Sequence, residues 1–172
     1  MDGKKPYKLY LAQGSNVPQG GIVGDFKKSG DEDFVCEIIL NDLEVKKSGC
    51  LDCVTTMFPD KAVIYISEGM LAALQQQGQV EEFELWHELG HIHCGHFDDE
   101  AAGGSEQGFD SEEQQADGFA ADMLGKDKVS EALGEMLKVQ AQVDASLKTN
   151  GSPASVKAIR KLRARINAIK NQ

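Results

Sequence analysis

The segment Glu84-Leu-Trp-His-Glu-Leu-Gly-His-Ile-His-Cys-Gly-His96 (ELWHELGHIHCGH) decides how the rest of this chain is interpreted, because it holds all four histidines. Residues four apart lie on the same face of a helix, so His87 and His91 can direct both imidazoles at one point, as two zinc ligands do. Glu88 follows the first ligand, and from there its carboxylate can take a proton from a water on the metal. The segment therefore predicts a zinc-binding helix with two ligands, His87 and His91, and a catalytic base, Glu88.

The residues around HELGH indicate that this helix is buried. Apolar side chains occur on more than one of its sides: Phe83, Leu85, Trp86, Leu89 and Ile92. Gly90 costs a helix about 1 kcal/mol relative to alanine, which makes sense where another part of the chain approaches the backbone closely. We expect such an approach at Gly90.

A third ligand is predicted on a helix over residues 111–124. Glu113 and Asp117 lie four residues apart and share a face of that helix. Glu113 completes a three-ligand site and leaves the fourth position open to water, as catalytic zinc requires. Asp117, one turn further on, can accept the free N–H of His87 or His91 and fix its tautomer.

The start of this helix determines which acid points towards the metal. Ser111 suits the N-cap, and this register favours Glu113 as the ligand. Because a helix start can shift by a residue or two, Glu112 is the alternative third ligand.

The two predicted helices together resemble those of the gluzincin metallopeptidases. It is most similar to the ImmA/IrrE family and the minigluzincins, whose pattern is HELGH, a short gap and a glutamate helix of the E-x-x-A-x-x-F-A-A type. In this sequence the pattern is His87 to His91 followed by Glu113 to Leu124, and the similarity covers roughly residues 62–124. The resemblance implies Zn²⁺ on His87, His91 and Glu113, Glu88 as general base, and a small twisted sheet packed on the HExxH helix. Members commonly cleave proteins inside cells, often regulators such as repressors of mobile elements.

The residue that would stabilise the oxyanion is left open. Larger gluzincins place a histidine or tyrosine near the scissile carbonyl, but no histidine or tyrosine follows Glu113 here. Tyr65, an arginine of the tail, His93 or His96 must then do that work, and the sequence does not choose among them.

The two remaining histidines are not predicted ligands. His93 lies two residues after His91 and so points to a different face, which favours a packed or solvent-facing side chain. His96 is expected to help end the helix, whose C-terminal dipole favours a cation. The longer metzincin pattern would need a glycine at position 94 and a histidine at position 97, where this chain has Cys94 and Phe97.

The periodicity predicts an α+β fold. Short β-branched and aromatic runs predict strands at Tyr7–Leu11, Phe34–Leu40 and Ala62–Ile66. Helical runs follow at Glu68–Gln77, Gln79–Cys94, Ser111–Leu124, Ser130–Leu147 and Pro153–Ile169, with an acidic, glycine-rich loop expected at Phe97–Asp110. We expect one zincin-like domain over residues 1–172, mainly β over 1–67, a helical zinc-site half over 68–150, and a basic amphipathic helix over 151–172.

The strand that precedes the zinc helix, Lys61–Ile66, has a predicted role in substrate binding. By the same resemblance, an extended substrate would add to an edge strand of the sheet and lie across the zinc. Which strand lies at the edge is left open, and the alternative is that Lys61–Ile66 is a fully paired strand of the core.

The net charge of −10 is unevenly distributed. From Glu81 to Asp122 the chain has thirteen acidic residues and no Lys or Arg, whereas eight basic residues and one acidic residue follow from Lys138 onward. The acidic centre would repel the phosphates of nucleic acid, which is therefore excluded as its partner. The basic C-terminal helix is expected to pack on the domain or on a partner.

No segment approaches the roughly 20 apolar residues of a membrane span, and the N-terminus lacks the apolar run of a signal peptide. We therefore expect a cytoplasmic protein without a membrane partner, whose four cysteines are reduced. Cys50-Leu-Asp-Cys53 is interpreted as a turn with two buried thiols, or alternatively as a structural metal corner with Cys36.

Together these features predict an intracellular zinc metalloendopeptidase that hydrolyses peptide bonds of a protein substrate, such as a regulator of a phage or mobile element. The alternative is a catalytically silent zinc-fold adaptor or inhibitor that binds a protein partner. A third hypothesis treats the histidine cluster as structural and metal-free.

Overall fold

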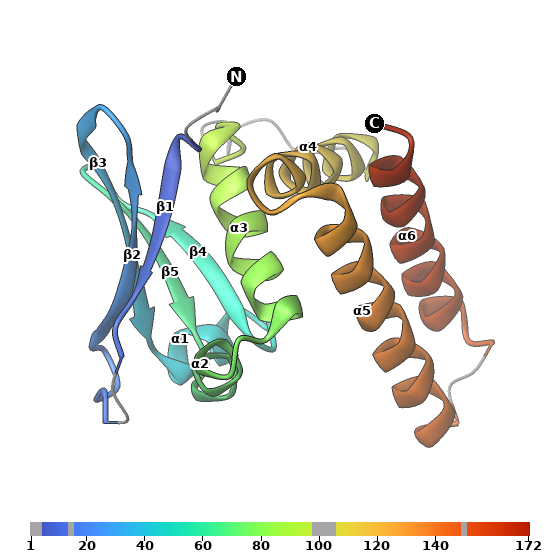
Figure 1. Cartoon of the computed structure of the whole chain (residues 1–172). Helices are drawn as coiled ribbons and strands as arrows, with labels where there is room; N and C mark the ends of the chain where they lie inside the picture. The colour runs from blue at the N-terminus through green and yellow to red at the C-terminus, as the bar shows by residue number, and fades with distance from the viewer. Residues whose placement is uncertain (1–4, 14–15, 98–105, 149–150) are drawn as a thin grey trace. The chain divides into compact units, whose positions relative to one another are not determined.

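The computed structural model describes residues 5–13, 16–97, 106–148 and 151–172 (Figure 1). The strands are β1 (Tyr7–Leu11), β2 (Ile22–Lys28), β3 (Asp31–Leu40), β4 (Cys53–Met57) and β5 (Ala62–Ile66). The helices are α1 (Asp42–Lys47), α2 (Glu68–Gln75), α3 (Gln79–His93), α4 (Glu106–Leu124), α5 (Lys126–Ser146) and α6 (Pro153–Lys170). The predicted α+β class is confirmed, with the sheet in the N-terminal part and helices in the C-terminal part.

The chain forms two compact units, Met1–Glu88 and Leu89–Gln172, and the boundary between them falls inside α3. The expectation of a single domain over residues 1–172 stays a prediction. Because the boundary follows Glu88, the HExxH motif contributes residues to both units.

A five-stranded mixed sheet dominates the first unit, in the order β1-β2-β3-β5-β4. All neighbouring strands are antiparallel except β3 and β5, which run parallel. β4 therefore lies at one edge of the sheet among the described strands, next to β5. Neither β2, β4 nor the short helix α1 was expected from the sequence, which predicted three of the five strands.

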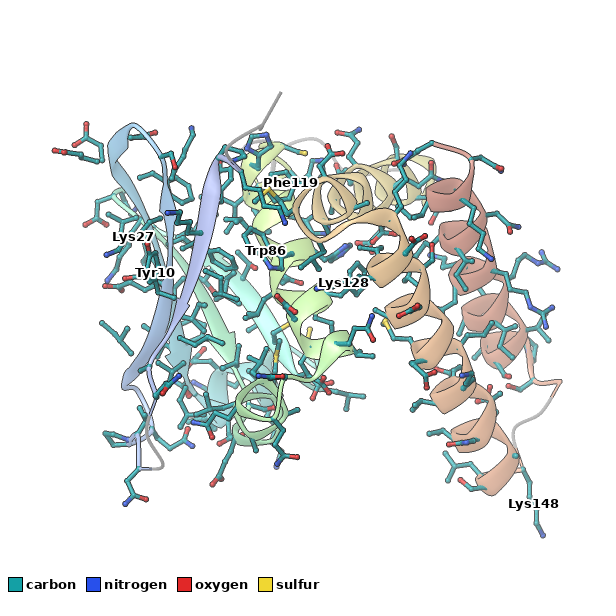
Figure 2. All side chains as sticks on the ribbon, viewed as in Figure 1. Tyr10, Lys27, Trp86, Phe119, Lys128 and Lys148 are labelled. Atoms are coloured by element: carbon teal, nitrogen blue, oxygen red, sulfur yellow. The ribbon has the colours of Figure 1, made fainter. Side chains whose placement is uncertain are left out.

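One face of the sheet packs on the N-terminal part of α3. Phe26 of β2 and Ile38 of β3 are fully buried, and the ring of Trp86 from α3 meets the ring of Phe26 edge to face, at 5.0 Å between centroids. Elsewhere in this unit the Lys27 ammonium lies 4.8 Å from the centre of the Tyr10 ring (Figure 2). The predicted burial of the HELGH helix is confirmed at Phe83, Leu85 and Leu89, which are at most 1% exposed.

In the second unit, α4, α5 and α6 pack against one another. A buried carboxylate joins α5 to α6: Asp144 is 5% exposed and accepts hydrogen bonds from the Ser155 hydroxyl and from Gln140 Nε2, the latter at 3.0 Å. The start of α6 agrees with its sequence, because Ser152 caps it by accepting from Ser155 N at 3.2 Å and Pro153 opens it. Among the described residues no helix is long and apolar enough to cross a membrane.

The expected start of α4 was wrong. This helix begins at Glu106, so Ser111 lies inside it instead of capping it, and the Ser111 hydroxyl accepts from Gln115 Nε2 at 3.4 Å. Near the start of α4, Asp110 forms an ion pair with Lys161 of α6 at 3.3 Å. Residues 106–110 of the predicted loop are therefore helical, while 98–105 lie outside the described residues.

Candidate metal centre

Three of the predicted site residues offer ligand atoms to one point. One atom from each of His87, His91 and Glu113 lies within 4.8 Å of the other two. His87 is 8% exposed, and His91 Nε2 lies 3.3 Å from Glu113 Oε1. This group can hold a metal ion, and it is the only such group of three or more found in the described part of the chain. It includes Glu113 and not the alternative, Glu112.

The close approach of α3 and α4 explains how His91 meets Glu113. A Cβ at Gly90 would lie 2.9 Å from both the Cα and the carbonyl oxygen of Ala116 on α4, closer than real Cβ atoms come to other atoms. Only a glycine lets these two backbones meet. The expected close approach at Gly90 is confirmed, and it comes from the backbone of Ala116.

Glu88, the predicted base, is held by the edge strand. The Thr55 hydroxyl of β4 donates a hydrogen bond to Glu88 Oε2. Thr55 pairs with Ile64 of β5, so both side chains lie on the sheet face that meets α3. The Thr55 hydroxyl therefore orients the Glu88 carboxylate, and both residues belong to the first unit.

Three other acidic residues lie near the part of α3 that precedes Glu88: Asp52, Glu81 and Glu84. Burial, and then Asp52, Glu81 and Glu88, raise the pKa of Glu84 to about 7, while His87 opposes the rise. Burial, and then Glu81, also raise the pKa of Asp52. Glu84 is therefore a carboxyl that resists ionisation one helical turn before the predicted base.

Asp117 has a partner that the sequence analysis did not identify. This carboxylate is 1% exposed and receives two hydrogen bonds from Arg165 of α6, from Nε and Nη2, each at 2.7 Å. Arg165 Nη1 also lies 3.8 Å from Glu113 Oε2. The basic helix thus brings a fixed cation to the third ligand, while the predicted bond from Asp117 to His87 or His91 stays a prediction.

Tyr65 lies on the other face of the sheet from Thr55. It is half-buried on β5, next to Ile64, and pairs with Val54. Because successive strand residues point to opposite faces, its side chain faces away from the sheet surface that carries Thr55. Its role as oxyanion stabiliser stays a prediction that this register does not support.

The two other histidines differ from each other. His93 is exposed, and its ring lies 4.7 Å from the ring of Phe119 on α4, which agrees with the packed or solvent-facing side chain that was expected. His96, by contrast, turns back so that its Nδ1 lies 2.7 Å from His91 Nδ1. The sequence contained a signal for this contact, because Gly95 at the helix end reverses the chain next to a ligand.

The cysteines do not form the suggested metal corner. Cys36 on β3 and Cys53 on β4 are separated by β5, where they pair with Ala62 and Ile66 respectively. Cys50 is exposed and Cys53 is half-buried, so the expectation of two buried thiols in a turn was wrong: β4 begins at Cys53 and leaves Cys50 outside the sheet. Burial raises the pKa of Cys36 and of Cys53, which keeps both thiols protonated.

Comparison with protein-family models, with curated proteins and with solved structures finds no match to this chain.

Proposed function

We propose that this protein is a zinc-dependent metalloendopeptidase of the gluzincin type, similar to the ImmA/IrrE family and the minigluzincins. The observation that carries the proposal is the gathering of His87, His91 and Glu113 within 4.8 Å, with Glu88 next to the first ligand. Two imidazoles and one carboxylate are a donor set that catalytic zinc uses, with one position left for water or substrate. Zinc, when bound there, supplies a Lewis acid and lowers the pKa of water in its open position.

Glu88 would act as the general base. Thr55 holds its Oε2, which leaves Oε1 as the oxygen to take the proton from the attacking water and pass it to the leaving amine. Fixing the carboxylate before substrate arrives reduces the reorganisation that the transition state requires. Thr55 is a positioning residue in this scheme.

Arg165 is our choice among the residues left open for stabilising the oxyanion. Its guanidinium is held by Asp117 and lies 3.8 Å from Glu113 Oε2, so a permanent positive charge accompanies the third ligand. An arginine remains charged at any working pH and can donate to a developing oxyanion. Tyr65 is the weaker choice, since it faces away from the sheet surface of Thr55.

The position of β4 at the edge of the sheet favours a protein or peptide as the substrate. Its outer backbone groups have no neighbouring strand among the described residues, and its Thr55 contacts Glu88. An extended peptide that adds to this edge would place its backbone next to the proposed base. The acidic groups Asp52, Glu81 and Glu84 nearby favour a substrate segment with basic side chains.

The test compares the wild type with Glu88→Gln, which keeps the shape of the side chain and removes the base. Both purified proteins are assayed for bound zinc and for cleavage of a peptide library, with Glu82→Gln as the matched control on the same helix. We expect equal zinc in all three proteins and cleavage that is lost only in Glu88→Gln.

Two outcomes would overturn the proposal. Stoichiometric zinc without cleavage by the wild type would favour the silent adaptor or inhibitor, whereas wild-type protein that binds no zinc and folds unchanged would favour a structural histidine cluster. If the wild type cleaves peptides and Glu88→Gln does not, a pull-down with Glu88→Gln from native extract would identify the substrate protein, because the variant binds it without cutting it.

A further inference from the structure

The end of α3 has a backbone geometry that returns the chain to a metal ligand. Gly95 has a φ of 73°, a left-handed conformation that glycine adopts readily. His96 N donates to His91 O at 3.0 Å and Gly95 N donates to Ile92 O at 3.2 Å. These two bonds form a Schellman motif, in which the residue after the glycine comes to lie beside the residue five positions before it.

In this chain the two residues that the motif brings together are both histidines. Schellman motifs usually join two apolar side chains at these positions. Here His91 Nδ1 and His96 Nδ1 lie 2.7 Å apart, with their rings at 69° to each other. At this distance one nitrogen must donate a proton and the other must accept it.

A glutamine on α4 fixes the direction of that hydrogen bond. Gln115 Nε2 donates to Ser111 Oγ, which leaves Gln115 Oε1 facing His96 Nε2 at 3.2 Å. An amide oxygen only accepts, so His96 Nε2 carries the proton. In a neutral imidazole, Nδ1 of His96 is then the acceptor, and Nδ1 of His91 is the donor.

This direction leaves a lone pair on His91 Nε2, the nitrogen on the side of Glu113. In this tautomer His91 Nε2 is an electron-pair donor 3.3 Å from Glu113 Oε1. A metal ion bound between the two atoms would accept an electron pair from each. The chain of bonds from Gln115 through His96 to His91 thus prepares His91 to bind a metal through Nε2.

We propose that His96 is a positioning residue that accepts the Nδ1 proton of His91 and holds His91 in the tautomer that binds metal through Nε2. The sequence predicted such a role for Asp117, whose carboxylate accepts from Arg165 on both oxygens, and that role stays a prediction beside the one proposed for His96. The consequence for zinc rests on the proposed function, but the tautomer is a property of the metal-free protein.

The first measurement is made without metal. Long-range ¹H–¹⁵N correlation spectra of the full-length chain in a chelator, at a pH of about 8 where an ordinary histidine is neutral, report which ring nitrogen carries the proton. We expect His91 protonated on Nδ1 and His96 on Nε2 in the wild type, and a mixture of tautomers at His91 in His96→Ala. A wild-type His91 protonated on Nε2, or an unchanged His91 in His96→Ala, would overturn the proposal.

The second measurement is zinc affinity by competition with a chelating dye. His96→Ala is expected to weaken zinc binding by roughly 10- to 100-fold, the usual effect of losing such a partner. His96→Asn keeps an acceptor oxygen near the position of Nδ1 and should restore affinity to within about threefold of the wild type, which is well under 1 kcal/mol. His93→Ala, which removes the exposed histidine of the same helix end, is the matched control and should bind as the wild type does.

The outcomes separate this proposal from the proposed function. Zinc affinity unchanged in His96→Ala, or as weak in His96→Asn as in His96→Ala, would overturn the positioning role. If the wild type shows the expected tautomers and binds no zinc, the peptidase proposal fails while the hydrogen-bond assignment stands. Thermal unfolding of each metal-free variant shows whether a loss of affinity comes from a loss of fold.

Discussion

Replacing Glu84 by glutamine is expected to stabilise the metal-free protein by an amount that grows as the pH rises from about 4.5 to about 7 and is constant above that. Burial and the neighbouring carboxyls raise the pKa of Glu84 from 4.5 to about 7 in the folded chain. As the pH rises between these values, the unfolded chain releases a proton that the folded chain retains, so the free energy of unfolding falls. Since one pKa unit corresponds to about 1.4 kcal/mol, the full loss above pH 7 is about 3 kcal/mol. Glutamine keeps the shape of the side chain without this cost.

Urea unfolding followed by circular dichroism, in a chelator, measures the effect in the wild type and Glu84→Gln. At about pH 8.5 the variant should be more stable by about 3 kcal/mol, and at about pH 4.5 by less than about 0.5 kcal/mol. Glu82→Gln, a half-buried control on the same helix, should stay within about 0.5 kcal/mol of the wild type at both pH values. No gain at the higher pH, or an equal gain at both, would refute the reasoning.

Two further substitutions test the packing around the metal ligands. Gly90→Ala forces a Cβ to within 2.9 Å of the α4 backbone and should cost about 1–3 kcal/mol in urea unfolding, whereas Gly134→Ala, with nothing within 4 Å, should stabilise α5 by about 0.5–1 kcal/mol. Equal effects at the two glycines would contradict the close approach. Arg165→Met deprives the buried Asp117 carboxylate of its guanidinium and should cost about 3–5 kcal/mol, with the exposed Arg163→Met within about 0.5 kcal/mol of the wild type; similar losses for the two would argue against the buried pair.

The strands with aromatic or β-branched runs were predictable, and the irregular ones were not. The predicted bounds of Tyr7–Leu11 and Ala62–Ile66 match β1 and β5. β4 was missed because Cys50-Leu-Asp-Cys53 resembles a turn, and only its pairing with β5 makes the following residues a strand. α1 was missed because its six residues include a single buried side chain, Val45, which gives no helical periodicity.

The metal ligands were predictable because their signal is local in the sequence. His87 and His91 lie one helical turn apart, and Glu113 stands at a fixed place in the next helical pattern. Arg165 had no such signal, because it meets Asp117 across 48 positions and only the packing of α6 on α4 selects it among the arginines of the tail. Interactions set by tertiary packing leave no periodicity in the sequence.

The buried Asp144 has a consequence for how the α5–α6 hairpin forms. Apolar helix faces tolerate sliding by one turn, because one aliphatic side chain replaces another at little cost. A slip of α6 along α5 would carry the Ser155 hydroxyl away from Asp144 and leave the carboxylate buried with fewer donors, at a cost of about 1–3 kcal/mol or more. The Asp144 carboxylate thus fixes the alignment of α5 and α6: it adds little to the free energy of unfolding, but it makes misaligned pairings of the two helices unfavourable.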